Sequence, residues 1–242
     1  MIRLAKSEDI YGLSKLLIEA FDLEYEINDI LDMIEPFKNT FVYEISGEIV
    51  STASAIPFVV GEKKGRYIYA VATDINYRGK GYAGEVLEYI KEYYKDTTDV
   101  LLLRPAEESL FDFYRRKGFK EEVYADVREI QFKGEEVPEM IDFDEYVKER
   151  SKYNAFSFSE KVMKYYFDNY NYCAFKGKDF LLLCGLSQNC CVFDEVYGNF
   201  ENADMSFVNV GKMIAVVNGK SVYALASFYD EKFDINFRVP ME

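Results

Sequence analysis

A glycine-rich turn joins a predicted strand to a predicted helix in the first half of the chain. Tyr67–Thr73 has the apolar residues of a strand, and a helical pattern of apolar residues begins at Ala83. The turn and the helix start hold three glycines within six residues: Gly79, Gly81 and Gly84. Glycine lets the backbone approach a ligand closely, and free N–H groups at a helix N-terminus attract anions. Because Arg78 and Lys80 add positive charge there, the pattern predicts a phosphate-bearing ligand.

The same residues resemble a known signature. Arg78-Gly79-Lys80-Gly81-Tyr82-Ala83 is similar to the Q/R-x-x-G-x-G/A motif of the GNAT (Gcn5-related N-acetyltransferase) family. The resemblance implies that the loop binds the pyrophosphate of acetyl-CoA and that the preceding strand pairs with the pantetheine arm. The implied cofactor-binding residues are Val71, Ala72, Thr73, Arg78, Gly79, Lys80, Gly81, Tyr82, Ala83 and Gly84. Taken alone, the glycines are equally typical of an ordinary turn, and they match neither the Walker A nor the GxGxxG pattern.

A second match follows further along the chain. Phe113-Tyr114-Arg115-Arg116-Lys117-Gly118-Phe119 resembles the lYekxGF element of the same family. The resemblance implies that Tyr114 is the general acid that protonates the CoA thiolate after an amine attacks the thioester. A phenol with a pKa of about 10 can do this. The resemblance also places Ser109 against CoA. A core aromatic is the alternative for Tyr114, and a plain helix-start serine is the alternative for Ser109.

Two longer stretches narrow the resemblance. Tyr69–Thr73 and Pro105–Tyr114 look like the N-terminal domain of the enhanced-intracellular-survival-like acetyltransferases of Gram-positive bacteria. The likeness covers about residues 1–132. The long relatives add a second GNAT-like domain and a sterol-carrier-like domain, and 242 residues are too few for both. Those relatives use their C-terminal carboxylate as general base, and Glu242 takes that role only if the intervening architecture is similar.

The sequence contains no histidine, which excludes His-dependent triads, His metal sites and a His general base. Amine attack still requires a group that accepts a proton, often through water. Glu24, Glu26 and Asp74 are candidates by placement alone. A solvated surface carboxylate is the alternative interpretation of each.

The order of predicted elements indicates an α+β protein with a GNAT fold: a central mixed, mostly antiparallel twisted sheet flanked by helices. We expect strands near 2–4, 40–45, 49–60, 67–73, 100–103 and 119–132. We expect helices near 10–21, where Ser7 would form the cap, and near 27–34, 83–94 and 109–116. The polar segment Lys133–Pro138 predicts a boundary between a GNAT domain, residues 1–133, and a smaller α+β domain, residues 138–242.

The second half has a weaker pattern. We expect a helix near 143–150, and a second one after a capping box formed by Ser157 and Glu160. Further predictions are strands at 180–184, 191–197, 222–228 and 234–237 and a helix at 203–213. This half lacks a glycine loop of the Arg78 type, and a degenerate GNAT-like unit is one interpretation of it.

Charge and composition restrict the partners. The net charge of −14 predicts a protein that binds neither nucleic acid nor anionic membrane. No apolar run reaches the ~18 residues of a membrane span, and residues 1–9 do not resemble a signal peptide, so a cytoplasmic location is expected. The four cysteines form no CxxC pair, which favours reduced buried thiols and no metal site: Cys173, Cys184, Cys190 and Cys191.

Three functions are compatible with these patterns. The first is an acetyl-CoA-dependent N-acetyltransferase that forms a ternary complex with a small-molecule or peptide primary amine. The second is a non-catalytic acyl-CoA-binding or regulatory module. The third is a structural protein in which both motifs are accidental, and the order and spacing of the two motifs argue against it. The excess of acid favours a cationic acceptor such as a polyamine, an aminoglycoside or lysine. The sequence does not indicate the oligomeric state.

Overall fold

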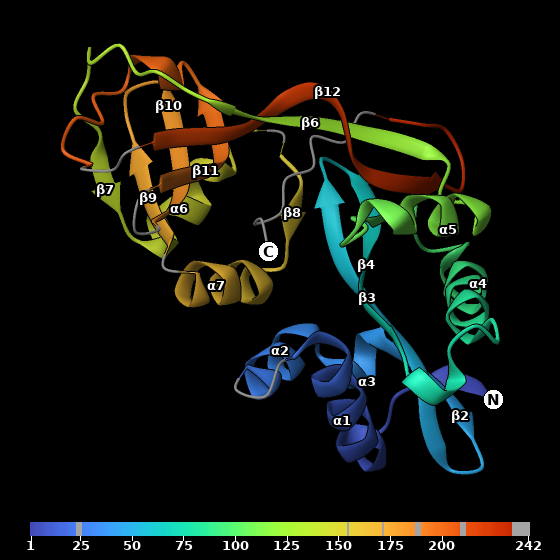
Figure 1. Ribbon diagram of the computed structural model, residues 1–242. Helices are drawn as coiled ribbons and strands as arrows, with labels where there is room; N and C mark the ends of the chain where they lie inside the picture. The colour runs from blue at the N-terminus through green and yellow to red at the C-terminus, as the bar shows by residue number, and fades with distance from the viewer. Residues whose placement is uncertain (23–25, 154, 171, 187–189, 209–211, 234–242) are drawn as a thin grey trace. The chain divides into compact units, whose positions relative to one another are not determined.

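The computed structural model describes residues 1–22, 26–153, 155–170, 172–186, 190–208 and 212–233 (Figure 1). The chain divides into two compact units. Unit 1 contains Met1–Glu122 and Ala224–Phe233, and unit 2 contains Val123–Tyr223. The expected break at 133–138 lies inside unit 2, where Glu136 pairs with Ala203. The limits of the two units differ from those of the predicted domains 1–133 and 138–242, and the division into those domains stays a prediction.

Two long strands explain this difference. Strand β6 (Glu121–Glu129) leaves unit 1 and enters unit 2, and β12 (Lys212–Phe228) returns from unit 2 to unit 1. The two strands pair with each other. Because the chain passes from one unit to the other within a regular strand, no loop marks the boundary. Glycine and proline residues, which mark turns and loops, therefore do not reveal it.

Unit 1 is built on a mixed, mostly antiparallel sheet in the order β1-β2-β3-β4-β5-β12. The pairs β1–β2, β2–β3, β3–β4 and β5–β12 are antiparallel, and β4–β5 is parallel. Its other strands are β1 (Ile2–Leu4), β2 (Thr40–Ile45), β3 (Glu48–Val60), β4 (Lys63–Thr73) and β5 (Val100–Leu103). Its helices are α1 (Ile10–Phe21), α2 (Ile27–Ile34), α3 (Pro36–Asn39), α4 (Tyr82–Tyr94) and α5 (Phe111–Arg116). Since α1 and α4 both pack against β3, the predicted helix-flanked sheet is confirmed.

The start of α1 differs from the expected serine cap. Ser7 is the first residue of a short 3-10 helix, Ser7–Asp9, that precedes α1. The side chain of Asp9 forms the local bonds instead: its Oδ2 accepts the Lys6 N–H at 2.7 Å, and its Oδ1 accepts a bond from Arg3 Nη2 at 2.9 Å. Ser7 therefore lies within the first helical turn and not before it, so its hydroxyl is not at a capping position.

Unit 2 has a sheet in the order β12-β11-β10-β9-β7, with β11–β12 parallel and the remaining pairs antiparallel. Its strands are β7 (Glu139–Ile141), the short β8 (Ser157–Phe158), β9 (Tyr172–Lys176), β10 (Phe180–Leu186) and β11 (Cys190–Gly198). Its helices α6 (Phe143–Arg150) and α7 (Glu160–Asn169) pack against β9. The unit therefore has the α+β composition that the sequence predicts.

Two local predictions in unit 2 are wrong. The cap of α7 is Ser159 rather than Ser157, which lies in β8. The expected helix at 203–213 is absent from its described residues, because the backbone of Ala203 pairs with Glu136 and Asp204 accepts the Ser206 N–H in a turn. The expected strand at 222–228 is the end of β12, and the one at 234–237 lies outside the described residues.

All four cysteines are free thiols, and Cys184 and Cys191 belong to a buried apolar cluster of unit 2. The hydrogen bond with Cys191, followed by burial, raises the pKa of Cys184. Among the described helices, none is both long and apolar enough to cross a membrane.

Candidate active site

Strands β4 and β5 separate before β4 ends. They pair in parallel only where Gly65–Tyr67 lies beside Val100–Leu102. β4 then continues to Thr73, and no described strand pairs with residues 68–73 on the side away from β3. This part of β4 therefore presents a backbone edge of the kind that an extended chain with amide groups can join.

A β-bulge lies within this open part of β4. Thr52 of β3 pairs with Ala72, and Ser54 pairs with Tyr69, so Ala70 and Val71 both face the single residue between them. Ala70 adopts a left-handed backbone with φ of 51°, which is uncommon for a residue other than glycine. Bulges of this kind redirect backbone groups and are frequent beside active sites. Sequence analysis missed the bulge because alanine, not glycine, takes the left-handed position.

The glycine-rich turn follows β4 directly. Asp74 caps a 3-10 helix, Ile75–Tyr77, by accepting the Asn76 N–H at 2.8 Å. Gly79 and Gly81 then have φ of 76° and 93°, and Gly81 is the N-cap of α4. A Cβ atom added at either glycine would meet no atom within 4 Å. The space in front of α4 is therefore open, and no side chain caps the N–H groups of its first turn. An anion in this space could bind to those N–H groups.

The two cations of the turn bond to the turn itself. Arg78 Nε donates to the carbonyl of Thr73 at 3.1 Å, and Lys80 Nζ donates to the carbonyl of Asn76 at 3.1 Å. Lys80 Nζ also lies 4.6 Å from the centre of the Tyr77 ring. Both side chains are exposed, so they place positive charge at the N-terminus of α4 and stiffen the loop. The residue types and the geometry together fit a pyrophosphate.

The first residues of α4 have different environments. The Tyr82 ring packs against that of Tyr43, with their centres 4.6 Å apart, and Ala83 is half-buried. Gly84 is buried, and a Cβ atom there would lie 2.3 Å from Cε of Lys117. A side chain at 84 would therefore displace the end of Lys117, a residue of the second motif. The ammonium of Lys117 is 2.9 Å from Glu88 Oε1, so the two motifs meet at this point.

Tyr114 is buried in α5, only 8% exposed. Its ring contacts those of Phe113 and Phe119 edge-on, with centres 5.0 and 6.2 Å away. Burial raises the pKa of Tyr114 to about 12. The Tyr114 hydroxyl makes no hydrogen bond with the residues that the structure describes. The phenol therefore keeps its proton at neutral pH and retains its capacity to donate it.

The other expected site residues are more loosely connected. Ser109 is exposed on a 3-10 helix, Glu108–Leu110, and its hydroxyl donates to Glu107 at 3.2 Å. Arg115 pairs with Asp112 at 3.2 Å and with Glu122 at 2.6 Å, so its charge is already neutralised. In the second basic run, Arg115–Lys117, it is Lys117 that lies beside the glycine-rich element.

The candidate general bases lie in different surroundings. One oxygen of Asp74 is committed to the cap of the 3-10 helix. Glu26 is an exposed carboxylate immediately before α2. Glu24 and Glu242 lie outside the described residues.

Residues 1–121 match a family model described as an acetyltransferase (GNAT) domain, which is half of the 242-residue chain. The chain belongs to the GNAT acetyltransferase family. The predicted family, enzyme class and co-substrate, acetyl-CoA, are confirmed at the level of that family. Comparison with curated proteins finds no significant match.

Solved structures extend the likeness over both units. A GCN5-related N-acetyltransferase from Anabaena variabilis ATCC 29413 has a TM-score of 0.73 at 12% identity, over 95% of this chain and 73% of that one. A probable N-acyltransferase from Enterococcus faecalis V583 has 0.70 at 14%, over 95% and 72%. Eis1 from Mycobacterium abscessus has 0.67 at 9%, over 95% and 74%. At these identities the likeness shows the fold, which is that of GNAT proteins with an additional C-terminal region.

Proposed function

We propose that this protein is an acetyl-CoA-dependent N-acetyltransferase that transfers the acetyl group to a primary amine by direct attack in a ternary complex. The proposal rests on one observation: along the chain, an open strand edge is followed directly by an open helix N-terminus. Residues 68–73 of β4 are unpaired by β5, and Gly81 opens α4 with empty space before it. An elongated thioester with amides in its arm and a pyrophosphate matches both features.

Binding of acetyl-CoA would use this chain's backbone more than its side chains. The N–H groups at the start of α4 would bind the pyrophosphate, with Gly79 and Gly81 providing access and Arg78 and Lys80 providing charge. Val71, Ala72 and Thr73 would pair with the pantetheine amides. The bulge at Ala70 lies just before them, so it would set the angle at which the thioester meets the strand.

In the chemical step, the amine nitrogen attacks the thioester carbonyl, a C–N bond forms and the C–S bond breaks. We infer that Tyr114 gives its proton to the departing sulfur, while the amine loses a proton to a carboxylate or to water. A pKa of about 12 keeps Tyr114 protonated, but it also makes the phenol a weaker acid than an ordinary thiol with a pKa of about 8.5. Proton transfer would therefore accompany the cleavage of the C–S bond and not precede it.

A non-catalytic acyl-CoA-binding module is the second candidate. The burial of Tyr114 between Phe113 and Phe119 favours it, because a core aromatic has the same contacts. The acceptor class is likewise open to test. The net charge of −14 favours a cationic amine through electrostatic steering.

Release of CoA thiol separates the two candidates. The full chain is mixed with acetyl-CoA, with and without spermidine, an aminoglycoside or a lysine peptide. We expect thiol release that depends on at least one amine and saturates with it. Saturable acetyl-CoA binding by calorimetry, with no amine-dependent thiol release across a broad amine screen, would favour the binding module.

A further inference from the structure

The side chain of Lys117 lies against the first turn of α4. Lys117 is the C-cap of α5, and Gly84 is the third residue of α4 after its N-cap, Gly81. A Cβ atom added at Gly84 would lie 2.3 Å from Cε and 2.5 Å from Nζ of Lys117. The ammonium of Lys117 therefore lies where a side chain at position 84 would be.

The turn that Lys117 contacts is the positive end of α4. The Glu85 N–H donates to the Gly81 carbonyl at 3.1 Å and so begins the hydrogen-bond ladder of the helix. The N–H groups of Tyr82, Ala83 and Gly84 precede this bond, and in helix geometry they have no acceptor within α4. They give this end of the helix a partial positive charge, which attracts anions and disfavours cations.

Two lysines cross between α4 and α5. Lys91, in the last turn of α4, donates from Nζ to the Lys117 carbonyl at 2.8 Å, at the end of α5. This contact is favourable, because the C-terminal end of a helix carries partial negative charge. The ammonium of Lys117 lies instead at the N-terminal turn of α4, where the helix dipole disfavours a cation.

A carboxylate compensates this cation in part. Lys117 Nζ is 2.9 Å from Glu88 Oε1, with the Lys117 side chain 26% exposed and that of Glu88 62% exposed. An ion pair this exposed contributes little stability, so it does not by itself account for a lysine at this end of α4. The ammonium has three N–H donors, of which the bond to Glu88 uses one.

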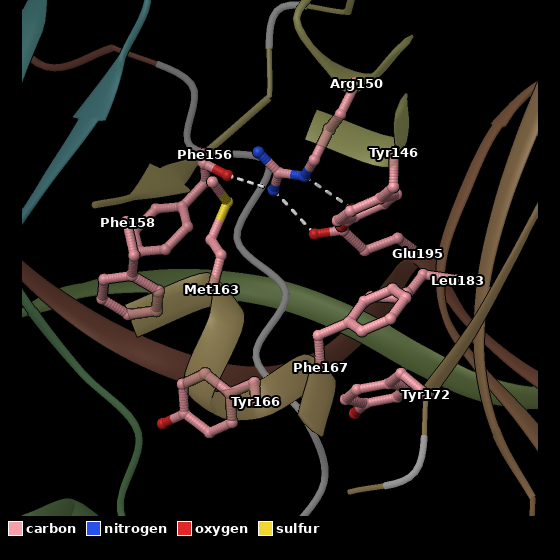
Figure 2. A pocket seen from close by; sticks show the side chains of 10 residues that line it. All are labelled: Tyr146, Arg150, Phe156, Phe158, Met163, Tyr166, Phe167, Tyr172, Leu183 and Glu195. Atoms are coloured by element: carbon pink, nitrogen blue, oxygen red, sulfur yellow. Dashed lines mark hydrogen bonds and ion pairs between the residues drawn. The ribbon is translucent and has the colours of Figure 1, made fainter. Parts of the chain in front are cut away.

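The ion pair Arg150–Glu195 of unit 2 shows a contrasting arrangement (Figure 2). Arg150 Nε donates to Glu195 Oε2 at 2.7 Å, and Arg150 Nη2 donates to Glu195 Oε1 at 2.6 Å. The Tyr146 hydroxyl donates to the same Oε2 at 2.7 Å. Arg150 and Glu195 are each only 7% exposed. The two charges of that pair compensate each other away from solvent, whereas the Lys117–Glu88 pair lies at the surface beside the proposed phosphate site.

We propose that Lys117 binds the pyrophosphate of acetyl-CoA, with its ammonium donating to a phosphate oxygen held at the first turn of α4. The inference rests on the proposed function, in which the same turn binds the pyrophosphate. With an anion at the turn, the position of Lys117 becomes favourable, since an ammonium and a phosphate form a strong charge-assisted hydrogen bond. Gly84 allows this contact, because it has no side chain between the ammonium and the turn.

The test measures binding of acetyl-CoA to the full chain by calorimetry, with no amine present, so transfer activity does not enter. Lys117→Met removes the ammonium, and we expect Kd to rise at least about tenfold, the range of a hydrogen bond between charged groups. Lys95→Met is the matched control, because Lys95 also forms an exposed ion pair, with Glu92. Lys95 follows the C-terminal end of α4, about 16 Å along the helix from Gly84, so this change should leave Kd unaltered.

Glu88→Gln distinguishes phosphate binding from a purely structural ion pair. Both Lys117→Met and Glu88→Gln break the pair, so a structural role predicts the same loss of affinity in each. The proposal predicts a Kd that is unchanged or lower in Glu88→Gln, because the ammonium stays and a nearby negative charge is removed. Gly84→Ala is a second variant at the same contact: its Cβ atom displaces the ammonium, so Kd should rise, with no further rise when it is combined with Lys117→Met.

The 3′-dephospho form of acetyl-CoA identifies the phosphate. It keeps the pyrophosphate, so Lys117→Met should raise its Kd by the same factor as that of acetyl-CoA. An unchanged Kd for the 3′-dephospho compound would assign Lys117 to the 3′-phosphate and overturn the proposal. Wild-type affinity in a folded Lys117→Met protein, or equal losses in Lys117→Met and Glu88→Gln, would also overturn it. No saturable binding of acetyl-CoA by the wild type would overturn the proposed function together with this inference.

Discussion

Phe119 and Tyr114 contact each other at the C-terminal end of α5. The Phe119 N–H donates to the Tyr114 carbonyl at 3.1 Å, and the Gly118 N–H donates to the Arg115 carbonyl at 3.0 Å. With Gly118 at φ of 87°, this is a Schellman motif, and the edge-on rings of Tyr114 and Phe119 supply its apolar contact. The backbone turn that ends the helix therefore also holds the candidate acid in place.

Gly118→Ala tests this relationship. A Cβ atom at 118 would lie 2.3 Å from Lys91 Nζ, which donates to the Lys117 carbonyl at 2.8 Å. We expect a loss of about 1–3 kcal/mol in the free energy of unfolding from the left-handed backbone, together with a fall in kcat as α5 shifts. Gly134→Ala is the matched control, since Gly134 has φ of 71° and an added Cβ atom there is 4.0 Å from its neighbour. The Gly134→Ala protein should lose a similar amount of stability and keep the wild-type kcat. Equal kcat values for the Gly118→Ala and Gly134→Ala proteins would contradict a positioning role for the turn at Gly118.

Gly81→Val tests the phosphate site. A valine side chain would fill the open space before α4, so we expect acetyl-CoA to lose its stabilising effect, which for the wild type is about 2.7 kcal/mol at one hundred times Kd. Gly47→Val is the matched control, because Gly47 has φ of 86° and equally open surroundings in the β2–β3 turn. Thermal unfolding with and without acetyl-CoA gives the comparison. A folded Gly81→Val protein that binds acetyl-CoA as the Gly47→Val protein does would place the phosphates elsewhere.

Glu195→Gln tests the buried ion pair of unit 2. The change leaves the Arg150 charge uncompensated, and we expect a loss of about 3–5 kcal/mol in urea unfolding followed by tyrosine fluorescence. Glu139→Gln removes an exposed partner of Lys176 and should cost less than about 1 kcal/mol. Replacement of both Arg150 and Glu195 by apolar residues should cost less than Glu195→Gln alone. A larger cost for the double change would show that the pair contributes net stability.

The same pair predicts a pH dependence. Burial raises the pKa of Glu195, but the charge and hydrogen bonds of Arg150 and the Tyr146 hydroxyl outweigh burial, so the pKa lies below its ordinary value of 4.5. Because the folded-state pKa is the lower one, the stabilisation is fully present above pH 4.5 and is lost as the pH falls through the folded-state value. Urea midpoints measured from pH 7 downward should fall less steeply in Glu195→Gln than in the wild type. Parallel curves would remove Glu195 from the acid response.

Local sequence patterns predicted the parts of the fold that depend on neighbouring residues. The bounds of α2 and α6 agree with the expected helices, since apolar periodicity defines both and Asp142 caps α6. The glycine-rich turn was found because positive φ at Gly79 and Gly81 needs that residue type.

Relationships between distant residues were not predictable in this way. The bulge at Ala70 depends on its register with β3. Strand β12 extends through both units because Met213 pairs with Cys191 of β11 and Leu225 pairs with Leu103 of β5. The Arg150–Glu195 pair joins residues 45 positions apart, and neither residue belongs to a recognisable motif. The available signal was an Arg with a Tyr four residues before it on the same helix face. In a charged helix this pattern resembles a solvated face.

Tyr114→Phe tests the role of the hydroxyl. The ring is kept, so we expect unchanged acetyl-CoA binding and a kcat lower by about 10²–10⁴. Because the pKa of Tyr114 is about 12, the wild-type rate should show no loss from Tyr114 ionisation between pH 6 and 9. Tyr94→Phe, at a buried tyrosine of α4, controls for loss of a buried hydroxyl. Wild-type turnover in folded Tyr114→Phe across this pH range would make Tyr114 a core aromatic.

Transfer of a labelled acetyl group to an amine tests the central claim most directly. The full chain is incubated with acetyl-CoA carrying an isotopically labelled acetyl group and with the amine that gives the fastest thiol release, and the products are analysed by mass spectrometry. We predict one labelled acetyl group on the amine for each CoA released, and none with the Gly81→Val protein. CoA release that yields labelled acetate and no acetylated amine would contradict an N-acetyltransferase.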